Sequence, residues 1–322
     1  MAPSSAALSH DDYTVAWICA LPLELAAAKS MLDEIHICLP QRSNDHNVYT
    51  LGRVSGHNVA IACLPLGLYG ATSATTVLGQ MLPTFSSLQF GLMVGIGGGV
   101  PGKADIRLGD VVVSTPTGTT SGVIQYDYGK RLRDGCIQRT GSLNKPPKVL
   151  LSAASKIQSD DMIGKQEIQQ IIIRALDKNE QMKDQFSRPS DDWLFCATYN
   201  HQDTTEPWCS SCDLNQLVNR PPRDTDEPYI HYGLIASGNQ VIKDAQTRDQ
   251  ILSQETDVLC FEMEAAGLMD QLPFLVIRGI CDYCDSHKDK QWQGYASLTA
   301  AAYAKLLLSE TPIFKKQLRK GM

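Results

Sequence analysis

Short apolar runs alternate with longer stretches of helical periodicity over much of the chain. Residues 14–20 form a continuous apolar run, short enough for a strand that is buried on both faces. Residues 48–54 and 59–64 flank a Ser-Gly-His turn and predict a hairpin. Further strands are predicted at 92–95, 110–114, 230–236, 258–261 and 274–280. Helices are predicted at 23–35, 71–82, 148–158, 166–176, 245–254, 263–271 and 292–308.

This alternation predicts an α/β fold in which helices flank a mostly parallel or mixed sheet. Ligands of such sheets bind beyond the carboxyl ends of the strands. Residues 126–228 are richer in prolines, charged residues and amides, and we interpret them as an inserted block of loops and helices. We expect one domain over 1–322, with a flexible N-terminus at 1–12 and a C-terminal tail at 312–322.

Composition narrows the classes of function. The chain has 322 residues and a net charge of −6, without the basic stripe that nucleic-acid binding requires. No apolar run is long enough to span a bilayer, and the first residues lack the pattern of a signal peptide. Ten cysteines suit a reducing compartment. We therefore expect a cytoplasmic protein with neither nucleic acid nor membrane as a partner.

Two carboxylates stand at a predicted strand-to-helix junction. Glu262 and Glu264 lie inside the apolar stretch 258–268. Acidic side chains are seldom buried without partners. A solvated helix start, with its favourable dipole, explains one of them but not both. We therefore expect at least one of the two to bind a ligand.

Asp282 directly follows the apolar run 274–281. A carboxyl group at the carboxyl end of a buried strand is placed for ligand binding. The structural alternative is an aspartate that caps the following turn. The presence of Glu264 as a second candidate carboxylate favours the functional interpretation of Asp282.

Glycine-rich segments follow two of the predicted strands. Residues 95–99 (GIGGG) permit positive φ angles and close approach of a ligand to backbone N–H groups, although a tight turn explains them as well. They form neither a dinucleotide fingerprint nor a P-loop, because no helix and no Gly-Lys-Ser/Thr follows. Residues 67–73 lead into a helix, where Thr72 and Ser73 offer hydroxyls to an anion or a sugar, or act as N-caps.

The chain resembles the purine nucleoside phosphorylase and nucleosidase superfamily in an ordered series of segments: ICALPLELAAAK, LGLYGATSAT, GIGGGV, LGDVVVST, YGLIASGNQVI, CFEMEAAGLMD and VIRGICD. The similarity covers patches of 14–125 and 229–308. More narrowly, the chain is similar to fungal nucleoside-phosphorylase-like domains, often found at the front of larger receptor-like proteins. The resemblance implies a three-layer α/β/α phosphorylase-like fold with a central mixed, twisted sheet, no cofactor, and a homodimer or homotrimer.

The resemblance also implies roles for individual residues. Glu264 would bind the ribose hydroxyls, Met263 would pack against the sugar, and Glu262 would be a further ribose-binding residue. Asp282 would be the general acid that protonates the purine as the base leaves. The pocket for the nucleophile or phosphate would be lined by Gly67, Thr72, Gly97 and Gly98.

The choice of nucleophile depends on Glu24. By itself, a glutamate in the first turn of a helix is an ordinary dipole partner. The nucleosidase branch of the superfamily, however, has a water-activating glutamate at this place. Phosphorylases need arginines around phosphate, and neither glycine-rich segment contains one, although Arg53 could reach the pocket from elsewhere. Hydrolysis is therefore favoured, with phosphorolysis as the alternative.

The resemblance places base binding in the segment Asn239, Gln240, Val241 and Ile242. The nucleosidases usually have Asp where Asn239 stands and Phe where Val241 stands, so a stacking ring is missing here. An Asn side chain both donates and accepts, and can bind a 6-oxo or a 6-amino purine. We consider Tyr232, Trp292 and Tyr295 as replacement rings.

The block 126–228 contains a loose cysteine cluster. Cys196, His201, Cys209 and Cys212 include one Cys-x-x-Cys, but the spacing matches no strong zinc-finger pattern. We interpret them as unligated cysteines and expect no metal, with a structural metal site or a disulfide as alternatives.

Several basic side chains are interpreted as surface residues of loops. If the substrate carries a phosphate, the same side chains are the ones that would meet it: Arg220, Arg223, His287, Lys288 and Lys290. Such contacts would turn a nucleoside enzyme into a nucleotide enzyme.

The sequence thus predicts an N-glycosidase that hydrolyses a small-molecule purine nucleoside to base and ribose. Three further functions stay open: a phosphorylase, an N-glycosidase that acts on nucleotides such as ATP, and a nucleoside-sensing module without catalysis. Glu264 alone suffices for binding, so the additional presence of Glu24 and Asp282 favours an enzyme.

Overall fold

The computed structural model describes residues 8–102, 104–133, 137–165, 167–201, 209–253 and 257–313. Most of the predicted N-terminal segment and C-terminal tail therefore lies outside the described residues. One large sheet runs through the protein in the order β11-β10-β6-β12-β5-β1-β4-β3-β2, with β7 beside β10. Its strands are β1 Val15–Cys19, β2 Glu34–Ile35, β3 Tyr49–Val54, β4 His57–Cys63, β5 Phe90–Gly99, β6 Val111–Ser114, β7 Val123–Gln125, β10 Ile230–Ser237, β11 Val258–Glu262 and β12 Phe274–Asp282.

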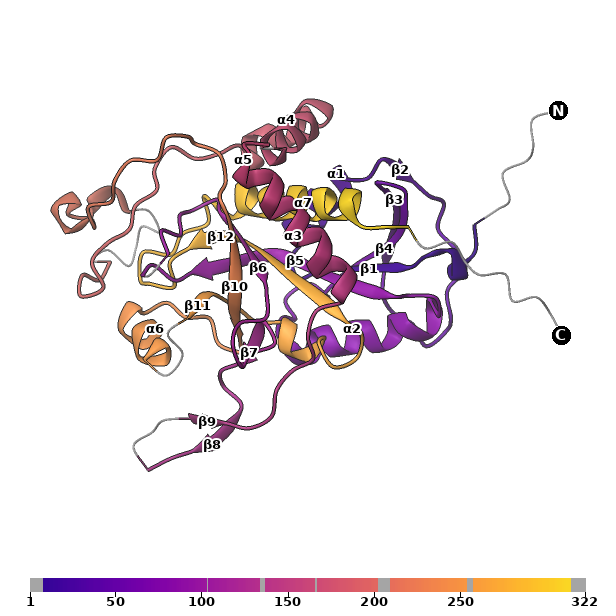
Figure 1. Ribbon diagram of the computed structural model, residues 1–322, viewed down its shortest axis with the longest axis horizontal. Helices are drawn as coiled ribbons and strands as arrows, with labels where there is room; N and C mark the ends of the chain where they lie inside the picture. The colour runs from indigo at the N-terminus through magenta and orange to yellow at the C-terminus, as the bar shows by residue number, and fades with distance from the viewer. Residues whose placement is uncertain are drawn as a thin grey trace.

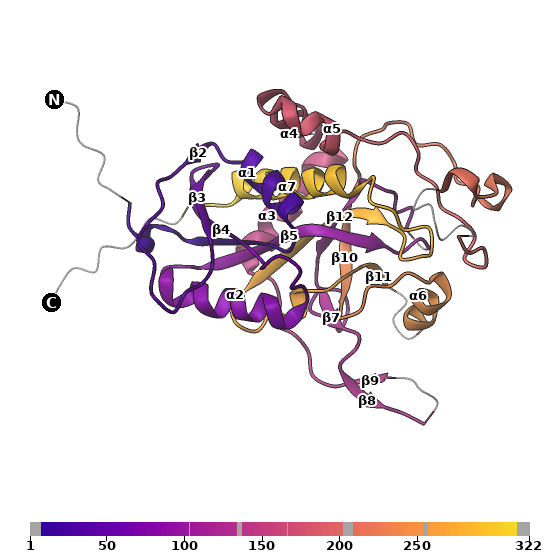
Figure 2. The same cartoon turned by 180° about the vertical axis from the view of Figure 1, so that it is seen from behind.

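Helices cover both faces of this sheet (Figures 1 and 2). The α-helices are α1 Pro22–Ser30, α2 Ala71–Thr84, α3 Lys148–Met162, α4 Ile168–Lys178, α5 Lys183–Phe186, α6 Ala245–Leu252 and α7 Gln293–Glu310. Short 3-10 helices are η1 His10–Asp12, η2 Glu180–Met182, η3 Cys209–Ser211, η4 Leu214–Gln216 and η5 Ala265–Gly267. The mixed sheet with flanking helices confirms the predicted fold class.

The alternation of side chains along each strand builds two cores. On β1, Val15, Trp17 and Cys19 face the core that contains α1, α3, α4 and α7, whereas Ala16 and Ile18 face the core beneath α2. Helix α7 lies at the centre of the first layer, and nearly all of its residues are buried. This explains why its sequence is apolar on every side.

Part of the sheet closes on itself. Strand β11 pairs in parallel with β10 and, through Cys260 and Phe261, antiparallel with Gly99 and Gly98 of β5. Because β10, β6, β12 and β5 are neighbours in turn, the five strands form a ring. The closure brings the carboxyl ends of β5, β11 and β12 together.

Four predicted elements differ from the structure. The glycines at 97–99 continue β5 and do not form a loop. Helix α1 ends at Ser30, because the chain then enters the short strand β2. Pro83 lies within the last turn of α2 without ending it, since there it removes only one helical hydrogen bond. The predicted helix at 263–271 is reduced to the single turn η5.

Much of the predicted insertion belongs to the main core. Helices α3 and α4 place Leu150, Ile157, Ile168 and Ile172 in the same apolar cluster as α7. The ribbon of β8 Gly129–Arg131 and β9 Ile137–Arg139 projects away from the body, as Figures 1 and 2 show. None of the described helices is long and apolar enough to cross a membrane.

Candidate active site

A cavity of about 640 Å³ opens at the carboxyl ends of β1, β5, β11 and β12. The strand register explains its position, because Asp282 on β12 and Phe261 on β11 both pair with Gly98. Most of the predicted site residues line it, and they are Glu24, Gly97, Gly98, Gln240, Val241, Ile242, Glu262, Met263, Glu264 and Asp282. The structure therefore brings together side chains from both ends of the sequence.

Glu264 lies between a backbone donor and a buried cation. Its Oε1 accepts a hydrogen bond from the backbone N of Gly70 at 3.2 Å, and its Oε2 lies 3.3 Å from Nη2 of Arg278. Burial raises the pKa of Glu264 to about 7, because the favourable field of Arg278 is opposed by burial and by Glu262 and Glu24. A carboxyl group with this pKa changes its charge near neutral pH.

Glu262 is fully engaged within the protein. Its carboxylate accepts hydrogen bonds from the backbone N–H groups of Glu264 and Ala265 and from Arg278. Its side chain has no exposed surface. These contacts anchor the turn that presents Glu264, so Glu262 acts through the geometry of its neighbour, and its proposed contact with ribose stays a prediction.

Arg278 is a buried residue of the cavity that sequence reasoning missed. It is 1% exposed and contacts Glu262 and Glu264 as well as the backbone O of Ile96. Burial by itself lowers the pKa of Arg278, but the three glutamates at 24, 262 and 264 raise it above its ordinary value. The signal is present in the sequence, since an arginine inside a fully apolar strand needs a buried partner.

Glu24 is held by three backbone donors. Its Oε2 accepts from Ala20 N at 2.6 Å and Leu21 N at 3.0 Å, and its Oε1 accepts from Ile96 N at 2.8 Å. The contacts with Ala20 and Leu21 stabilise the start of α1, so the structural interpretation of Glu24 holds alongside its place in the cavity. Burial raises the pKa of Glu24, although Arg278 and the backbone donors act in the opposite direction.

For Asp282, as for Glu24, the structural interpretation holds alongside a place in the cavity. Its Oδ1 accepts from Cys284 N at 3.0 Å, which caps the turn after β12, where Cys284 has a φ of 55°. Its Oδ2 pairs with Nζ of Lys288 at 2.8 Å. Burial by itself lowers the pKa of Lys288, but Asp282 and the nearby Cys281 raise it above its ordinary value. Both carboxylate oxygens are thus fixed in position.

The glycines of β5 allow the charged side chains to approach the strand. None of the glycines at 95, 97, 98 and 99 has a positive φ, so close packing is what requires them. A Cβ on Gly98 would overlap Sγ of Cys284 and lie 2.8 Å from Oδ1 of Asp282. A Cβ on Gly95 would collide with the carboxylate of Glu24.

This packing predicts the effect of Gly98→Ala. The added methyl group must displace Asp282 or Cys284, and overpacking of this kind destabilises a protein by about 1–3 kcal/mol. Urea unfolding and catalytic turnover measure the two consequences. Gly102→Ala is the matched control, because a Cβ there meets nothing within 4 Å. Equal stability and turnover in both variants would show that Gly98 has no such role.

The loop at 67–73 contributes to the cavity differently than expected. Gly67 and Gly70 have positive φ angles, and Tyr69 lines the cavity. Gly67 and Thr72 are not among the lining residues. No side chain caps α2, whose N-cap is Gly70. A role for Gly67 and Thr72 in holding a nucleophile therefore stays a prediction.

The predicted base-binding segment lies partly in the cavity. Gln240, Val241 and Ile242 line it, whereas Asn239 does not. The side-chain oxygen of Asn239 accepts from Ala71 N at 3.2 Å, and its backbone N donates to Asp127 at 2.7 Å. Asn239 thus ties two loops together, and a direct contact with a base stays a prediction.

The rings that line the cavity differ from those suggested by the sequence. They are Tyr69 and Phe261. Tyr232 bonds to the Tyr303 hydroxyl, and Trp292 and Tyr295 line other hollows. Sequence patterns place such residues on strands and helices but do not show which edge or face meets the cavity.

Arg53 also lies away from the cavity. It pairs with Glu34 at the sheet edge and is not among the lining residues. Its guanidinium is therefore not placed to bind a phosphate nucleophile.

The pKa of Glu264 predicts a dependence of stability on pH. Between its ordinary value of 4.5 and about 7, the folded state binds more protons at this carboxyl than the unfolded state. Rising pH then favours unfolding, by at most about 1.4 kcal/mol per pH unit for one group. We expect the free energy of unfolding to fall across this range in the wild type and to fall less in Glu264→Gln. Parallel curves for the two proteins would contradict the shift.

The comparisons with known proteins identify the family and the fold. A family model described as the phosphorylase superfamily matches residues 14–308, and the chain belongs to this superfamily. An NLR-like (nucleotide-binding leucine-rich repeat) protein of Hyaloscypha variabilis is 48% identical over 303 residues, which are 94% of this chain and 30% of that protein. The chain therefore spans less than a third of this relative's length. The ATP nucleosidase Cap17 of Escherichia coli is 38% identical over 72 residues, covering 21% of this chain and 14% of that protein.

Solved structures share the fold at low identity. A putative 5′-methylthioadenosine/S-adenosylhomocysteine nucleosidase of Borrelia burgdorferi, bound to adenine, matches with a TM-score of 0.60 and 17% identity over 92% of this chain and 99% of that chain. The futalosine hydrolase of Helicobacter pylori matches with a TM-score of 0.57 and 15% identity over 94% and 100%. These similarities confirm the fold expected from the sequence.

Proposed function

We propose that this chain is a purine nucleosidase, which hydrolyses the N-glycosidic bond between a purine and ribose. One observation carries the proposal: Asp282, Glu264 and Glu24 line a single cavity at the carboxyl ends of the strands. The shared fold with nucleosidase structures supports this class of reaction.

Each carboxyl group has a separate task in the proposed reaction. Glu264 accepts hydrogen bonds from the ribose hydroxyls, and Met263 packs beside the sugar. Asp282 gives a proton to a purine nitrogen as the C–N bond breaks, so that the base leaves neutral and the ribose ring carries the positive charge. In the structure Oδ2 of Asp282 is ion-paired with Nζ of Lys288 at 2.8 Å, so Asp282 must first take up the proton that it donates, from the Lys288 ammonium or from solvent, as the substrate displaces Lys288.

Glu24 is the proposed base for water. A carboxylate has about four lone-pair sites, and backbone donors occupy three of them in Glu24. The remaining site can accept a hydrogen bond from a water molecule. As the water oxygen attacks the anomeric carbon, its proton passes to Glu24, whose raised pKa strengthens it as a base.

The charges close to Glu24 and Glu264 favour water over phosphate as the nucleophile. Arg278 is already bonded to Glu262 and Glu264 and also lies in the field of Glu24. Free phosphate beside these carboxylates would be repelled, without an uncommitted arginine among the residues that line the cavity in the described part of the chain. Phosphorolysis would therefore depend on the lysines at 243, 288 and 290 to offset that repulsion.

A panel of purine and pyrimidine nucleosides, read by chromatography of the released base, tests the proposed class. We expect release from at least one purine nucleoside and none from pyrimidine nucleosides. Binding of a nucleoside without release would contradict the enzyme and support the sensing module.

A second candidate is hydrolysis of nucleotides, with the same bond broken. Lys243, Lys288 and Lys290 line the cavity and can neutralise phosphate groups of a substrate. The similarity to an ATP nucleosidase supports this alternative. The same panel with nucleoside triphosphates decides it: faster base release from ATP than from adenosine favours the nucleotide enzyme, and the reverse favours the nucleosidase.

A further inference from the structure

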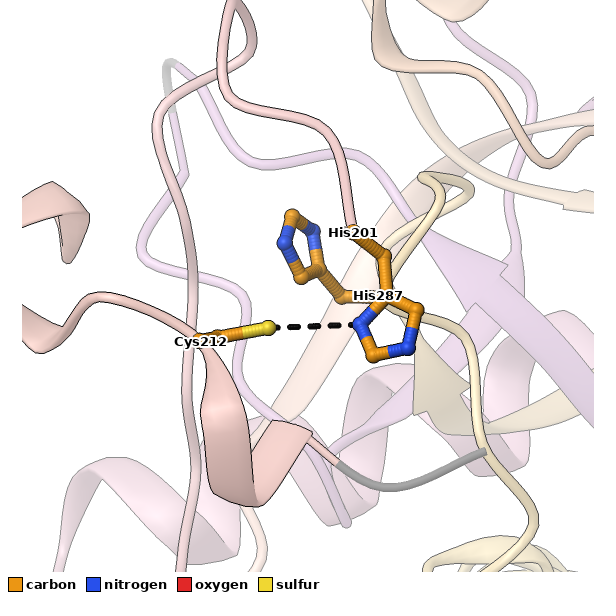
Figure 3. A group of neighbouring side chains, drawn as sticks. All are labelled: His201, Cys212 and His287. Atoms are coloured by element: carbon orange, nitrogen blue, oxygen red, sulfur yellow. Dashed lines mark hydrogen bonds between the residues drawn. The ribbon is translucent and has the colours of Figure 1, made fainter. Parts of the chain in front are cut away.

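A group of metal-ligand side chains lies outside the carboxylate cluster of the active site. One ring nitrogen of His201, one ring nitrogen of His287 and the sulfur of Cys212 all lie within 4.8 Å of one another. Nδ1 of His201 lies 3.2 Å from Sγ of Cys212. Figure 3 shows the three residues entering from separate segments of the chain. His201 and Cys212 come from the 126–228 block, and His287 comes from the loop between β12 and α7.

Cys209 adds a fourth donor to this group. Its Sγ lies 3.9 Å from Nδ1 of His201, and η3 places it one turn before Cys212. Cys209 and Cys212 are each 7% exposed. The Cys-x-x-Cys spacing, which is inconclusive in the sequence alone, therefore places one sulfur in the converging group of three and a second sulfur beside its His201.

His287 provides an independent indication of a ligand. Its side chain is 5% exposed, and neither ring nitrogen has a hydrogen-bond partner in the described part of the chain. The ring is stacked against Phe195, at 4.1 Å between centroids, and lies near-parallel to Tyr199, at 5.5 Å, which holds it in place. The carboxylate of Asp285 approaches Nδ1 only to 4.0 Å. A buried polar nitrogen without a partner is unfavourable, and a coordinated metal would remove that cost.

We propose that His201, Cys209, Cys212 and His287 bind a zinc ion. Zinc–sulfur bonds of about 2.3 Å and zinc–nitrogen bonds of about 2.0–2.1 Å place sulfur and nitrogen about 3.6 Å apart in a tetrahedral site. The two sulfur–nitrogen distances to His201, 3.2 Å and 3.9 Å, bracket that separation. Two thiolates and two imidazoles form the donor set that zinc prefers in closed structural sites.

The site would connect the 126–228 block to the loop that follows Asp282. His201 N already donates to Oγ of Ser286 at 2.9 Å across the same junction. His287 directly precedes Lys288, whose Nζ pairs with Asp282. Zinc would thus order the loop that positions Lys288 in the cavity, and it would take no part in the reaction itself. This inference is independent of which substrate the cavity binds.

Metal analysis of the chain, purified without chelators, tests the proposal. We expect about one zinc per chain, because four protein ligands complete a structural site. Replacement by Co²⁺ should give the visible absorption of a tetrahedral site together with thiolate-to-cobalt charge transfer. Removal of zinc by a chelator should lower the melting temperature, and added Zn²⁺ should restore it.

Single substitutions assign the ligands. Cys212→Ser and His287→Gln should weaken zinc binding by more than the roughly 10–100-fold that loss of an outer-shell partner causes. Cys196→Ser is the matched control, since Cys196 lies in the same block but outside the converging group. Folded wild-type protein that contains no zinc and takes up none on titration would overturn the proposal. So would unchanged zinc binding in both ligand variants.

Discussion

Asp282→Asn should lower kcat for base release by about 10²–10⁴-fold, the usual contribution of a general acid. The amide keeps the size of the side chain, and its oxygen can still accept from Cys284 N, which Asp282 binds at 3.0 Å. It has no acidic proton to give to the departing purine. KM should change much less than kcat, because the acid acts on the transition state. Initial rates of base release over a range of substrate concentrations measure both constants.

Asp289→Asn is the matched control for this substitution. Asp289 also lines the cavity, and its carboxylate caps a turn by accepting from Gln291 N at 2.8 Å. The same chemical change there should leave kcat nearly unaltered. Undiminished turnover in Asp282→Asn would remove Asp282 from the role of acid. Melting curves of both variants control for the loss of the ion pair with Lys288.

Arg278→Met should lower the free energy of unfolding by about 3–5 kcal/mol, the range for removal of one partner from a buried ion pair. The substitution leaves Glu262 and Glu264 buried without their cation. Urea denaturation at several pH values measures the loss. It should be smaller below about pH 7 than above it, because Glu264 then takes up a proton.

Arg53→Met is the control for the loss of a cation. Its pair with Glu34 is 3.3 Å long, and both side chains are about half exposed, at 43% and 55%. Exposed pairs contribute at most about 1 kcal/mol. A similar small loss in Arg278→Met would contradict a central electrostatic role for Arg278.

Local sequence is sufficient to single out Asp282, which directly follows an apolar run, and Glu264, which lies inside an apolar stretch. Arg278 is harder to find, because a single arginine does not interrupt the strand that the surrounding apolar residues predict. Its partners come from the end of β11 and the turn after it, and the ring closure between β11 and β5 that sets them together depends on long-range pairing. Hydrophobic patterns do not carry that information.

Lys288 and His287, which follow Asp282, are a second case in which local sequence does not predict the contacts of a side chain. Their sequence suggests only that Lys288 and His287 are loop residues able to contact a phosphate. In the structure Lys288 pairs with Asp282, whereas His287 faces Cys212 and His201 across the junction with the 126–228 block. The direction of each side chain follows from how two distant segments pack, which local sequence does not determine.

The nucleophile is tested most directly by the sugar product. Wild-type protein is incubated with the nucleoside or nucleotide that it cleaves best, in phosphate-free buffer and in saturating phosphate, and the sugar is identified by mass spectrometry. We expect equal rates of base release in both buffers, with the unesterified C1 hydroxyl of ribose as the product each time. Release that requires phosphate and yields a ribose 1-phosphate would contradict hydrolysis and the role of Glu24 as the base for water.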